Sequence, residues 1–387
     1  MQPPKFFLSH CRKDAEELKI IARILMAHGI RTWQDINNLG SGLTESEIRR
    51  AIQEDCNGLV FYSTADSLKS PMVRDVELKV GEEKFLKDKN FHIVPVFKST
   101  IDEANTALRG YLKTNISDFN GAIVKGDDFL VAGIRTAAVI FKNLVFSNTD
   151  FMSVGLCSYQ KTCEEVSLDC DFTPYFSLGL PPEKVWNEEF VPALRGLKDA
   201  LLSKNNTKLR LFSRAHLSLG IMFGYIFRDR TGFTLEIEQI NKPDKKIWST
   251  VAKEEPNLVK IEITPVGNLD SKNLVVNINL ISNDNNSFSN YVQKSGLRYR
   301  AMIEAHPVSY PCLVSNGEAL SFTKELIDKI KSAHGAFGTN TVHIFAAIPL
   351  GLALFIGYHL NACGQVQCYE FDKAKREYFP SANLENF

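Results

Sequence analysis

The chain has 387 residues, with 45 basic and 45 acidic side chains and therefore no formal net charge. This length is enough for two or three domains, each able to bury its own core. The charge balance argues against bulk attraction to DNA, long RNA or an anionic membrane, so an anionic ligand must be bound by a local cluster of residues. The eight cysteines form no CxxC pair and match no histidine motif, so we expect reduced thiols, no metal site and a cytoplasmic protein.

The first 145 or so residues alternate short apolar runs with helical patterns, which is typical of a parallel α/β sheet. The runs are apolar on consecutive positions, as strands covered on both faces should be, and they lie at 6–8, 59–62 and 93–97. Capping patterns predict helix starts at Thr44 and Ser70. A last helix is expected over roughly 127–146, followed by a domain boundary.

The rest of the chain contains an internal repeat. The stretches 208–239 and 341–372 align at an offset of 133 residues, which pairs Gly224 with Gly357. In the second copy, nineteen consecutive residues from Val342 carry no formal charge, a length that suits a membrane span. The first copy carries several arginines, which a span would not tolerate cheaply, so we predict no membrane segment. Each copy is expected to form a strand, a tight turn, a helix and another strand.

Two such copies predict two Rossmann-like halves that face each other. In open α/β sheets, ligands bind beyond the carboxyl ends of the strands, where helix N-termini present free N–H groups. Those ends fall at 213–218 in one half and at 346–351 in the other, so we expect an anion site there.

Three segments of the N-terminal part, KFFLSHCRKD, GIRTWQDINNLGSGLTESEIRRAI and GLVFYSTADSLKSPMVRDVEL, resemble the three conserved boxes of the TIR domain. The resemblance covers about residues 5–145, and we place the domain at 1–147. It implies a flavodoxin-like fold with a parallel sheet. For many members of the family it also implies cleavage of the nicotinamide–ribose bond, that is, a NAD+ glycohydrolase whose substrate is NAD+ and which needs no cofactor.

The family's catalytic glutamate corresponds to Glu77, whose carboxylate would stabilise an oxocarbenium-like transition state beside the ribose. Matching positions imply that NAD+ is bound by Ser9, His10, Arg12, Trp33, Asp35, Leu39, Gly42 and Ser70. Many active members have tryptophan four residues before the glutamate, where this chain has Val73. The alternative hypothesis is therefore a non-catalytic TIR module that recruits a partner when the C-terminal sensor is occupied.

The repeated stretches RAHLSLGIMFGYIF and VHIFAAIPLGLALFIGYHL, with CYEFD after the second, are similar to the SAVED domain over about residues 155–387. The family implies two fused CARF-like halves, placed at about 155–265 and 266–387, that bind a cyclic oligonucleotide. The combination resembles a TIR-SAVED effector of CBASS antiphage defence. This implies activation by a cyclic trinucleotide such as cyclic tri-adenylate, self-association into oligomers or filaments, and loss of cellular NAD as an abortive-infection response.

For the cyclic nucleotide, the residues at the two strand ends and on the following helix are our candidates: Arg214, His216, Ser218, Tyr225, Arg228, Pro349 and Gly351. Tyrosine occupies the position of Tyr225 in both copies, which a buried core position would also explain. A further alternative keeps the enzyme but gives the C-terminal half a linear or non-nucleotide ligand.

Overall fold

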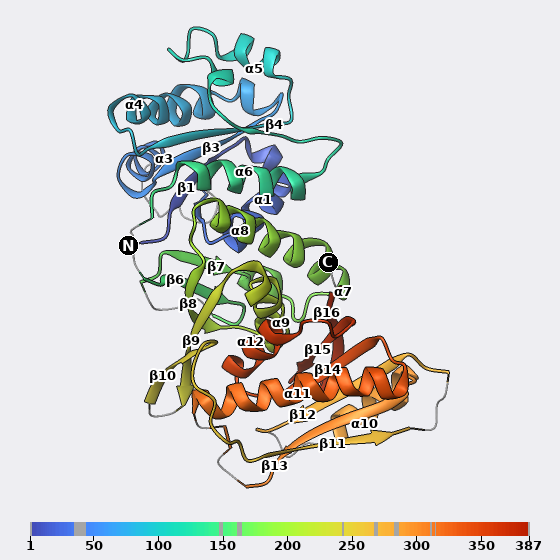
Figure 1. Ribbon diagram of the computed structural model, residues 1–387. Helices are drawn as coiled ribbons and strands as arrows, with labels where there is room; N and C mark the ends of the chain where they lie inside the picture. Colours follow the sequence, from blue (N-terminus) through green and yellow to red (C-terminus); the bar gives the residue numbers. More distant parts are fainter. Residues whose placement is uncertain are drawn as a thin grey trace. The chain divides into compact units, whose positions relative to one another are not determined.

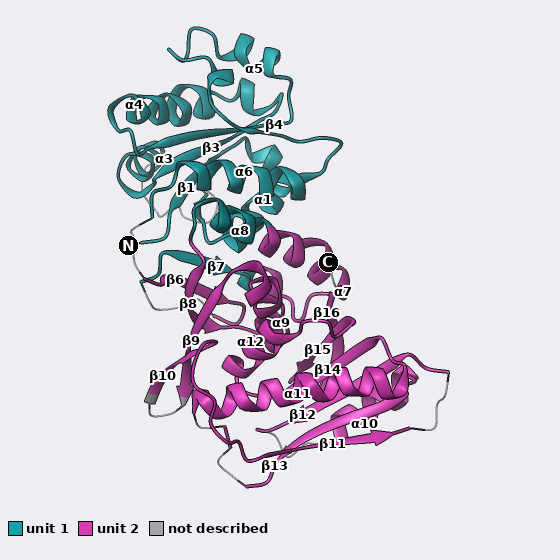
Figure 2. Ribbon diagram, viewed as in Figure 1, with its two compact units in different colours: residues 1–149, 163–174, 196–205 teal, residues 150–162, 175–195, 206–387 magenta. Residues whose placement is uncertain are grey.

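A computed structural model of the chain divides into two compact units (Figure 2). Unit 1 comprises residues 1–149, 163–174 and 196–205, and unit 2 comprises 150–162, 175–195 and 206–387. The structure describes residues 2–34, 44–146, 150–160, 165–241, 244–266, 270–281, 286–309, 312–313 and 315–385.

Unit 1 is built on a sheet of five parallel strands in the order β2-β1-β3-β4-β5 (Figure 1). The strands are β1 Lys5–Ser9, β2 Arg31–Trp33, β3 Gly58–Ser63, β4 His92–Phe97 and β5 Ala122–Ile123. Every residue of β3 is buried, as its apolar run predicts. The strand order is that of the flavodoxin-like folds, so the predicted fold class of this part is confirmed.

The helices of unit 1 are α1 Ala15–Ala27, α3 Thr44–Arg50, α4 Lys79–Lys87, α5 Ile101–Leu108 and α6 Phe129–Asn143. The last helix matches the one predicted over 127–146, and its first turn is capped by Asp128, whose side chain accepts a hydrogen bond from the N–H of Val131. A π-helical turn, Met72–Leu78, leads into α4. Such turns are rare and often occur at functional sites. A further strand of unit 1 is β7 Leu168–Asp171.

The first half of unit 2 contributes four strands in the order β10-β9-β8-β6. They are β6 Met152–Cys157, β8 Lys208–Arg214, β9 Thr234–Asn241 and β10 Asp244–Ser249. Only β10 is antiparallel to its neighbour in this set. The helices of this stretch are α7 Glu183–Val185 and α9 Leu217–Ile226, while α8 Val191–Ser203 begins in unit 2 and continues in unit 1 from residue 196.

The second half of unit 2 forms a six-stranded sheet in the order β11-β13-β12-β14-β15-β16. The strands are β11 Val259–Pro265, β12 Asn273–Asn279, β13 Ala301–Pro307, β14 Thr341–Ala347, β15 Gln365–Asp372 and β16 Glu377–Leu384. The central strands are parallel, and the edge strands β11 and β16 are antiparallel to their neighbours. Its helices are α10 Asn286–Ser295, α11 Asn316–Phe337 and α12 Leu350–His359. Because β11 pairs with β13, this sheet begins before the predicted boundary near residue 265.

The internal repeat appears as two strand–helix units, β8–α9 and β14–α12, whose helices pack against each other. The contact depends on paired glycines, because a Cβ on Gly224 would lie 2.1 Å from the carbonyl oxygen of Leu354, and one on Gly357 would lie 2.0 Å from that of Ile221. The predicted strand, turn and helix are thus confirmed in both copies. The uncharged stretch from Val342 is divided between β14 and α12, and no described helix is long and apolar enough to cross a membrane.

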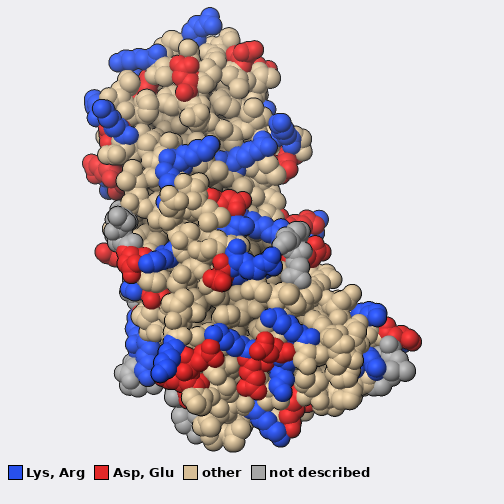
Figure 3. Space-filling model, in the orientation of Figure 1, with Lys and Arg blue, Asp and Glu red and all other residues tan. Residues whose placement is uncertain are grey.

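Charged side chains of both signs are interspersed over the face drawn in Figure 3. This distribution agrees with the zero net charge of the sequence. A ligand of high charge must therefore find its partners in a particular pocket rather than in a field of one sign.

Candidate functional site

Glu77 lies at the topological switch point of the unit 1 sheet, beside the end of β1. This strand has β2 on one side and β3 on the other. The side chain of Glu77 is 4 % exposed, and its Oε2 accepts a 2.6 Å hydrogen bond from the hydroxyl of Ser9, the last residue of β1. Flavodoxin-like sheets bind their ligands at this place, beyond the carboxyl ends of the strands. The structure thus brings together two of the predicted residues, a carboxylate and the hydroxyl that orients it.

The other predicted NAD-binding residues range from buried core positions to exposed turns. Trp33 is 5 % exposed and stacks on Phe7 with ring centroids 4.8 Å apart, so it is part of the core. His10 follows Ser9 and has its Nδ1 3.0 Å from the carbonyl oxygen of Leu8. Arg12 is exposed in the turn after β1. Ser70 precedes the π-helical turn, while Asp35, Leu39 and Gly42 lie outside the described residues.

A second acid near the end of β1 was not predicted from the sequence. Asp14 is 9 % exposed and accepts a 2.7 Å hydrogen bond from the hydroxyl of Thr64, which follows β3. Burial raises the pKa of Asp14 above its ordinary value. Two buried carboxyl groups, Asp14 and Glu77, are therefore held by hydroxyl groups at the carboxyl ends of adjacent strands.

Unit 2 contains a cavity of about 390 Å³ at the corresponding edge of its second sheet. Its lining residues come mainly from the second half, and they are Tyr159, Ala215, Leu217, Asn277, Asn279, Ile281, Ser287, Phe288, Ala346, Ala347, Ile348, Leu350, Glu370, Phe371, Lys373 and Tyr378. Strand β12 has β13 on one side and β14 on the other, so this edge is also a topological switch point. Residues from both predicted strand ends, 213–218 and 346–351, therefore line this cavity.

The N-termini of α9 and α12 are capped across the two halves of unit 2. The N–H of Ser218, in the first turn of α9, donates to Oε2 of Glu370 on β15 at 2.9 Å. The N–H of Gly351, in the first turn of α12, donates to Oε1 of Gln239 on β9 at 2.9 Å. At each helix, one first-turn amide group expected for an anion is thus already bonded to a side chain of the opposite half.

The two caps are equivalent in geometry and different in charge, because one is an amide and the other is an acid. Glu370 is 5 % exposed and lines the cavity. Burial raises the pKa of Glu370 to about 7, against the opposing effect of its hydrogen bonds from the first turn of α9. This end of the cavity is therefore unsuited to a phosphate, which would face a second anion whenever Glu370 is ionised.

Among the predicted ligand residues at the first strand end, His216 has the most direct access to a pocket. It lines a smaller chamber of about 270 Å³ that shares Tyr159, Phe371 and Lys373 with the main cavity. Arg214 is half-buried, and its Nη1 donates to the carbonyl oxygen of Ser213 at 2.8 Å. Ser218 is fully buried, and its Oγ accepts from the hydroxyl of Ser381 at 2.7 Å.

The remaining predicted residues lie outside the lining of the two pockets. Tyr225 is 4 % exposed, and its hydroxyl donates to the carbonyl oxygen of Glu385 at 2.8 Å. Arg228 is 8 % exposed and covers the Tyr225 ring at 4.1 Å, a cation–π contact. Pro349 is the N-cap residue of α12, and Gly351 leaves room for Gln239, because a Cβ would lie 2.8 Å from its Oε1.

Two kinds of cavity residue were missed by the sequence analysis. Asn277 and Asn279, two positions apart on β12, lie on one face of the strand and line the main cavity. Lys373, in the turn after β15, lines both pockets. The asparagines could have been noticed as polar positions in an otherwise apolar strand, whereas nothing in the sequence marks Lys373 among its charged neighbours. The described residues contain no cluster of His, Cys, Asp and Glu that could hold a metal ion.

Comparison with known proteins identifies two domain families in the chain. The TIR domain family matches residues 6–125, and the family described as a SMODS-associated sensor domain fused to various effectors, SAVED, matches residues 193–384. A CD-NTase-associated protein 4 of Enterobacter hormaechei is 24% identical over 203 residues, which are 51% of this chain and 40% of that protein. The chain thus aligns with less than half the length of this curated relative.

Solved structures show the same fold. A Cap4 SAVED/CARF-domain receptor of Acinetobacter baumannii, solved with the cyclic trinucleotide 3'3'3'-cAAA, has a TM-score of 0.51 and 15% identity over 90% of this chain and 86% of its own. The same receptor with 2'3'3'-cAAA gives the same values.

The fold and the family matches define a two-domain protein that joins an effector module to a sensor module. The chain belongs to the proteins in which an N-terminal TIR domain is fused to a C-terminal SAVED domain, as the sequence predicted. The predicted pair of CARF-like halves in the SAVED part is likewise confirmed.

Proposed function

We propose that the protein is a NAD+ glycohydrolase of CBASS antiphage defence, activated by a cyclic oligonucleotide bound in the unit 2 cavity. The observation that carries the enzymatic part is the buried Glu77–Ser9 pair at the switch point of the TIR sheet. Loss of nicotinamide leaves a ribosyl oxocarbenium-like transition state, and a fixed carboxylate beside the ribose stabilises that positive charge. The Ser9 hydroxyl holds Glu77 in one orientation, so little reorganisation is needed when the charge develops.

The sensing part is supported by the cavity and by the relatives. The A. baumannii receptors of the same fold were solved with cyclic tri-adenylates. In this chain the cavity combines the side-chain amides of Asn277 and Asn279 with the ring of Tyr159, which is 57 % exposed. Amides suit the polar edges of bases, and aromatic rings suit their faces. A cyclic trinucleotide such as cyclic tri-adenylate is therefore our proposed activator.

Activation is proposed to occur by self-association of the ligand-bound form, so that TIR domains of neighbouring molecules complete one another's pockets. A repeated head-to-tail contact produces a filament when its rotation does not close a ring. The ligand must bind the associated form more tightly than the free form, or it shifts nothing. Activity should then rise with protein concentration at saturating ligand.

The test is nicotinamide release by purified protein with NAD+ and a panel of cyclic di-, tri- and tetranucleotides. We expect release with one of them, and loss of that release in Glu77→Gln, which keeps an acceptor for Ser9 and removes the charge. Glu82→Gln is the control, because Glu82 is equally buried at 4 % exposure but accepts from the backbone of Lys113 and Thr114. Glu82→Gln should retain activity even if its melting temperature falls.

An active Glu77→Gln variant would remove Glu77 from the mechanism. Binding of one cyclic nucleotide without any NAD+ loss in the parent would instead favour the recruiting TIR module.

A further inference from the structure

The smaller chamber of unit 2 differs from the main cavity in the side chains that line it. It measures about 270 Å³ and opens beside the main cavity, with which it shares Tyr159, Phe371 and Lys373. Its other notable lining group is the imidazole of His216, the N-cap residue of α9. The chamber thus combines one cation and one imidazole beside the main cavity.

The hydrogen bonds of His216 determine which ring nitrogen carries its proton. The backbone N–H of His216 donates to Ser158 Oγ at 2.9 Å, and the same oxygen lies 2.7 Å from the ring Nδ1. Nδ1 is the one acceptor for the Ser158 hydroxyl proton that the described part of the chain provides, so the hydroxyl donates to Nδ1. The ring proton is then on Nε2, where it can be donated to a ligand in the chamber.

The ring is also fixed in position and neutral. His216 is stacked between Tyr159 and Phe176, with centroid distances of 3.9 and 4.2 Å. Burial lowers the pKa of His216 to about 4, and the nearby charge of Lys373 acts in the same direction. At neutral pH the ring is therefore an uncharged donor held between two aromatic side chains.

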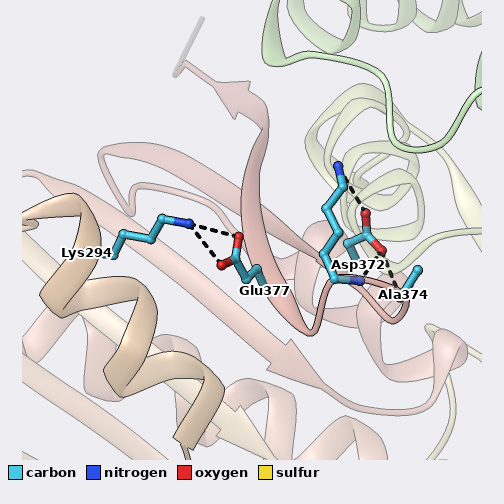
Figure 4. A network of polar contacts seen from close by, with 5 residues as sticks. Lys294, Asp372, Ala374 and Glu377 are labelled. Atoms are coloured by element: carbon cyan, nitrogen blue, oxygen red, sulfur yellow. Dashed lines mark hydrogen bonds and ion pairs between the residues drawn. The ribbon is translucent and has the colours of Figure 1, made fainter.

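Lys373 is presented by a braced turn between β15 and β16. Asp372 closes the turn by accepting the N–H groups of Ala374 and Lys375, at 2.9 and 3.1 Å (Figure 4). The start of β16 is tied to α10 by Glu377, whose two carboxylate oxygens accept from Lys294 (Figure 4). The carboxylate of Asp372 is thus engaged within the turn.

The lining of both pockets contains a single Lys or Arg among the described residues, and it is Lys373. Its ammonium group forms no ion pair with any residue in the described part of the chain. An unpaired lysine in the lining of a pocket is suited to bind a phosphate.

We propose that this chamber is a subsite for one phosphodiester of the activating ligand, in which Lys373 neutralises the charge and the Nε2–H of His216 donates a hydrogen bond. The inference rests on the proposed sensing of a cyclic oligonucleotide. The N–H groups of Ser218 and Gly351 do not compete for this phosphate, because they already donate to Glu370 and Gln239. The ligand is therefore oriented with a phosphate at the β15–β16 turn and its bases toward β12.

The test is calorimetric binding of 3'3'3'-cyclic tri-adenylate, and of the other cyclic trinucleotides, to the full chain and four variants. Lys373→Gln should weaken binding roughly 10- to 100-fold and reduce its salt dependence, and Lys373→Arg should restore most of the affinity. His216→Phe keeps the aromatic stack and removes the donor, so it should weaken binding by roughly 3- to 10-fold. Lys375→Gln, on the same turn but outside both pocket linings, should stay within about twofold of the parent.

The outcomes separate the two levels of the proposal. If the parent binds a trinucleotide and Lys373→Gln binds it equally well, the subsite is wrong while sensing stands. An equal loss in Lys375→Gln would show a general charge effect and would also overturn the subsite. If the folded parent binds none of the probes, the proposed sensing fails, and this inference fails with it. Far-UV circular dichroism of each variant shows that a lost affinity is not a lost fold.

Discussion

An acid, Glu370, caps α9, and an amide, Gln239, caps α12. This difference predicts a pH dependence of stability, which exchanging the two residue types can test. Glu370 and Gln239 accept equivalent backbone N–H groups at 2.9 Å, but only Glu370 titrates. Because burial raises the pKa of Glu370 from 4.5 to about 7, the folded chain binds this proton more tightly than the unfolded chain. Its stabilising contribution is fully present below pH 4.5 and is lost as the pH rises through 7.

The size of the effect follows from the same values. Each pH unit of difference corresponds to about 1.4 kcal/mol, so ionised Glu370 costs the folded protein about 3 kcal/mol at pH 8 relative to pH 4.5. Glu370→Gln removes the titration and retains an acceptor for Ser218. Between pH 5 and pH 8 the cost changes by about 2.5 kcal/mol. For a domain of 150–250 residues, 1 kcal/mol changes the melting temperature by about 2–4 °C, so the variant should gain about 5–10 °C over the parent across this range.

The assay is thermal unfolding of the parent, Glu370→Gln and Gln239→Glu at pH 5, 6, 7 and 8, with each variant compared with the parent at the same pH. His216, which lines the neighbouring chamber, has its pKa lowered to about 4 and stays neutral over that range. Gln239→Glu should place a titrating acid at the N-terminus of α12, as Glu370 does at α9, so this variant should lose stability as the pH rises. Curves for Glu370→Gln that remain parallel to the parent at all four pH values would refute the reasoning.

Two predictions concern packing and capping in unit 2. Gly224→Ala should cost about 1–3 kcal/mol, because its Cβ would meet the Leu354 carbonyl oxygen at 2.1 Å; Gly335→Ala, with nothing within 4 Å, should be neutral or stabilising. Equal melting temperatures for these two variants would contradict the close helix contact. Ser315→Ala should lower stability by about 1 kcal/mol, because Ser315 and Glu318 form the capping box that begins α11, and urea unfolding would measure the loss.

The sequence predicted the strand ends that flank the cavity but not the side chains that face it. At the first strand end, Ala215 and Leu217 line the main cavity, whereas Arg214 and Ser218 do not. The lining residues are each one position away from the predicted ones, and no sequence pattern fixes the place where β8 stops and α9 begins to one residue. The predicted element was correct, and the choice of residues within it required the backbone.

Tyrosine at equivalent positions of the two copies illustrates a different limit. The hydroxyl of Tyr225 donates to the carbonyl oxygen of Glu385, and that of Tyr358 donates to the carbonyl oxygen of Phe233, both at 2.8 Å. Two buried tyrosines that each bond a distant backbone oxygen have a structural role. The presence of tyrosine in both copies of the sequence could not distinguish this structural role from ligand binding. Trp33 belongs with them, because its stack on Phe7 depends on the pairing of β1 with β2.

The position of Glu370 would connect the proposed ligand to both halves of unit 2. Glu370 belongs to β15, three residues before Lys373, yet its carboxylate caps α9 of the other half. A phosphate bound at the proposed Lys373 subsite would fix the end of β15 and therefore the acid that caps α9. Because α9 packs on α12 through Gly224 and Gly357, any displacement of one helix is resisted by the backbone of the other. Binding at the β15–β16 turn should therefore stabilise the two halves as one body, by about 2.7 kcal/mol at a ligand concentration of 100 times Kd.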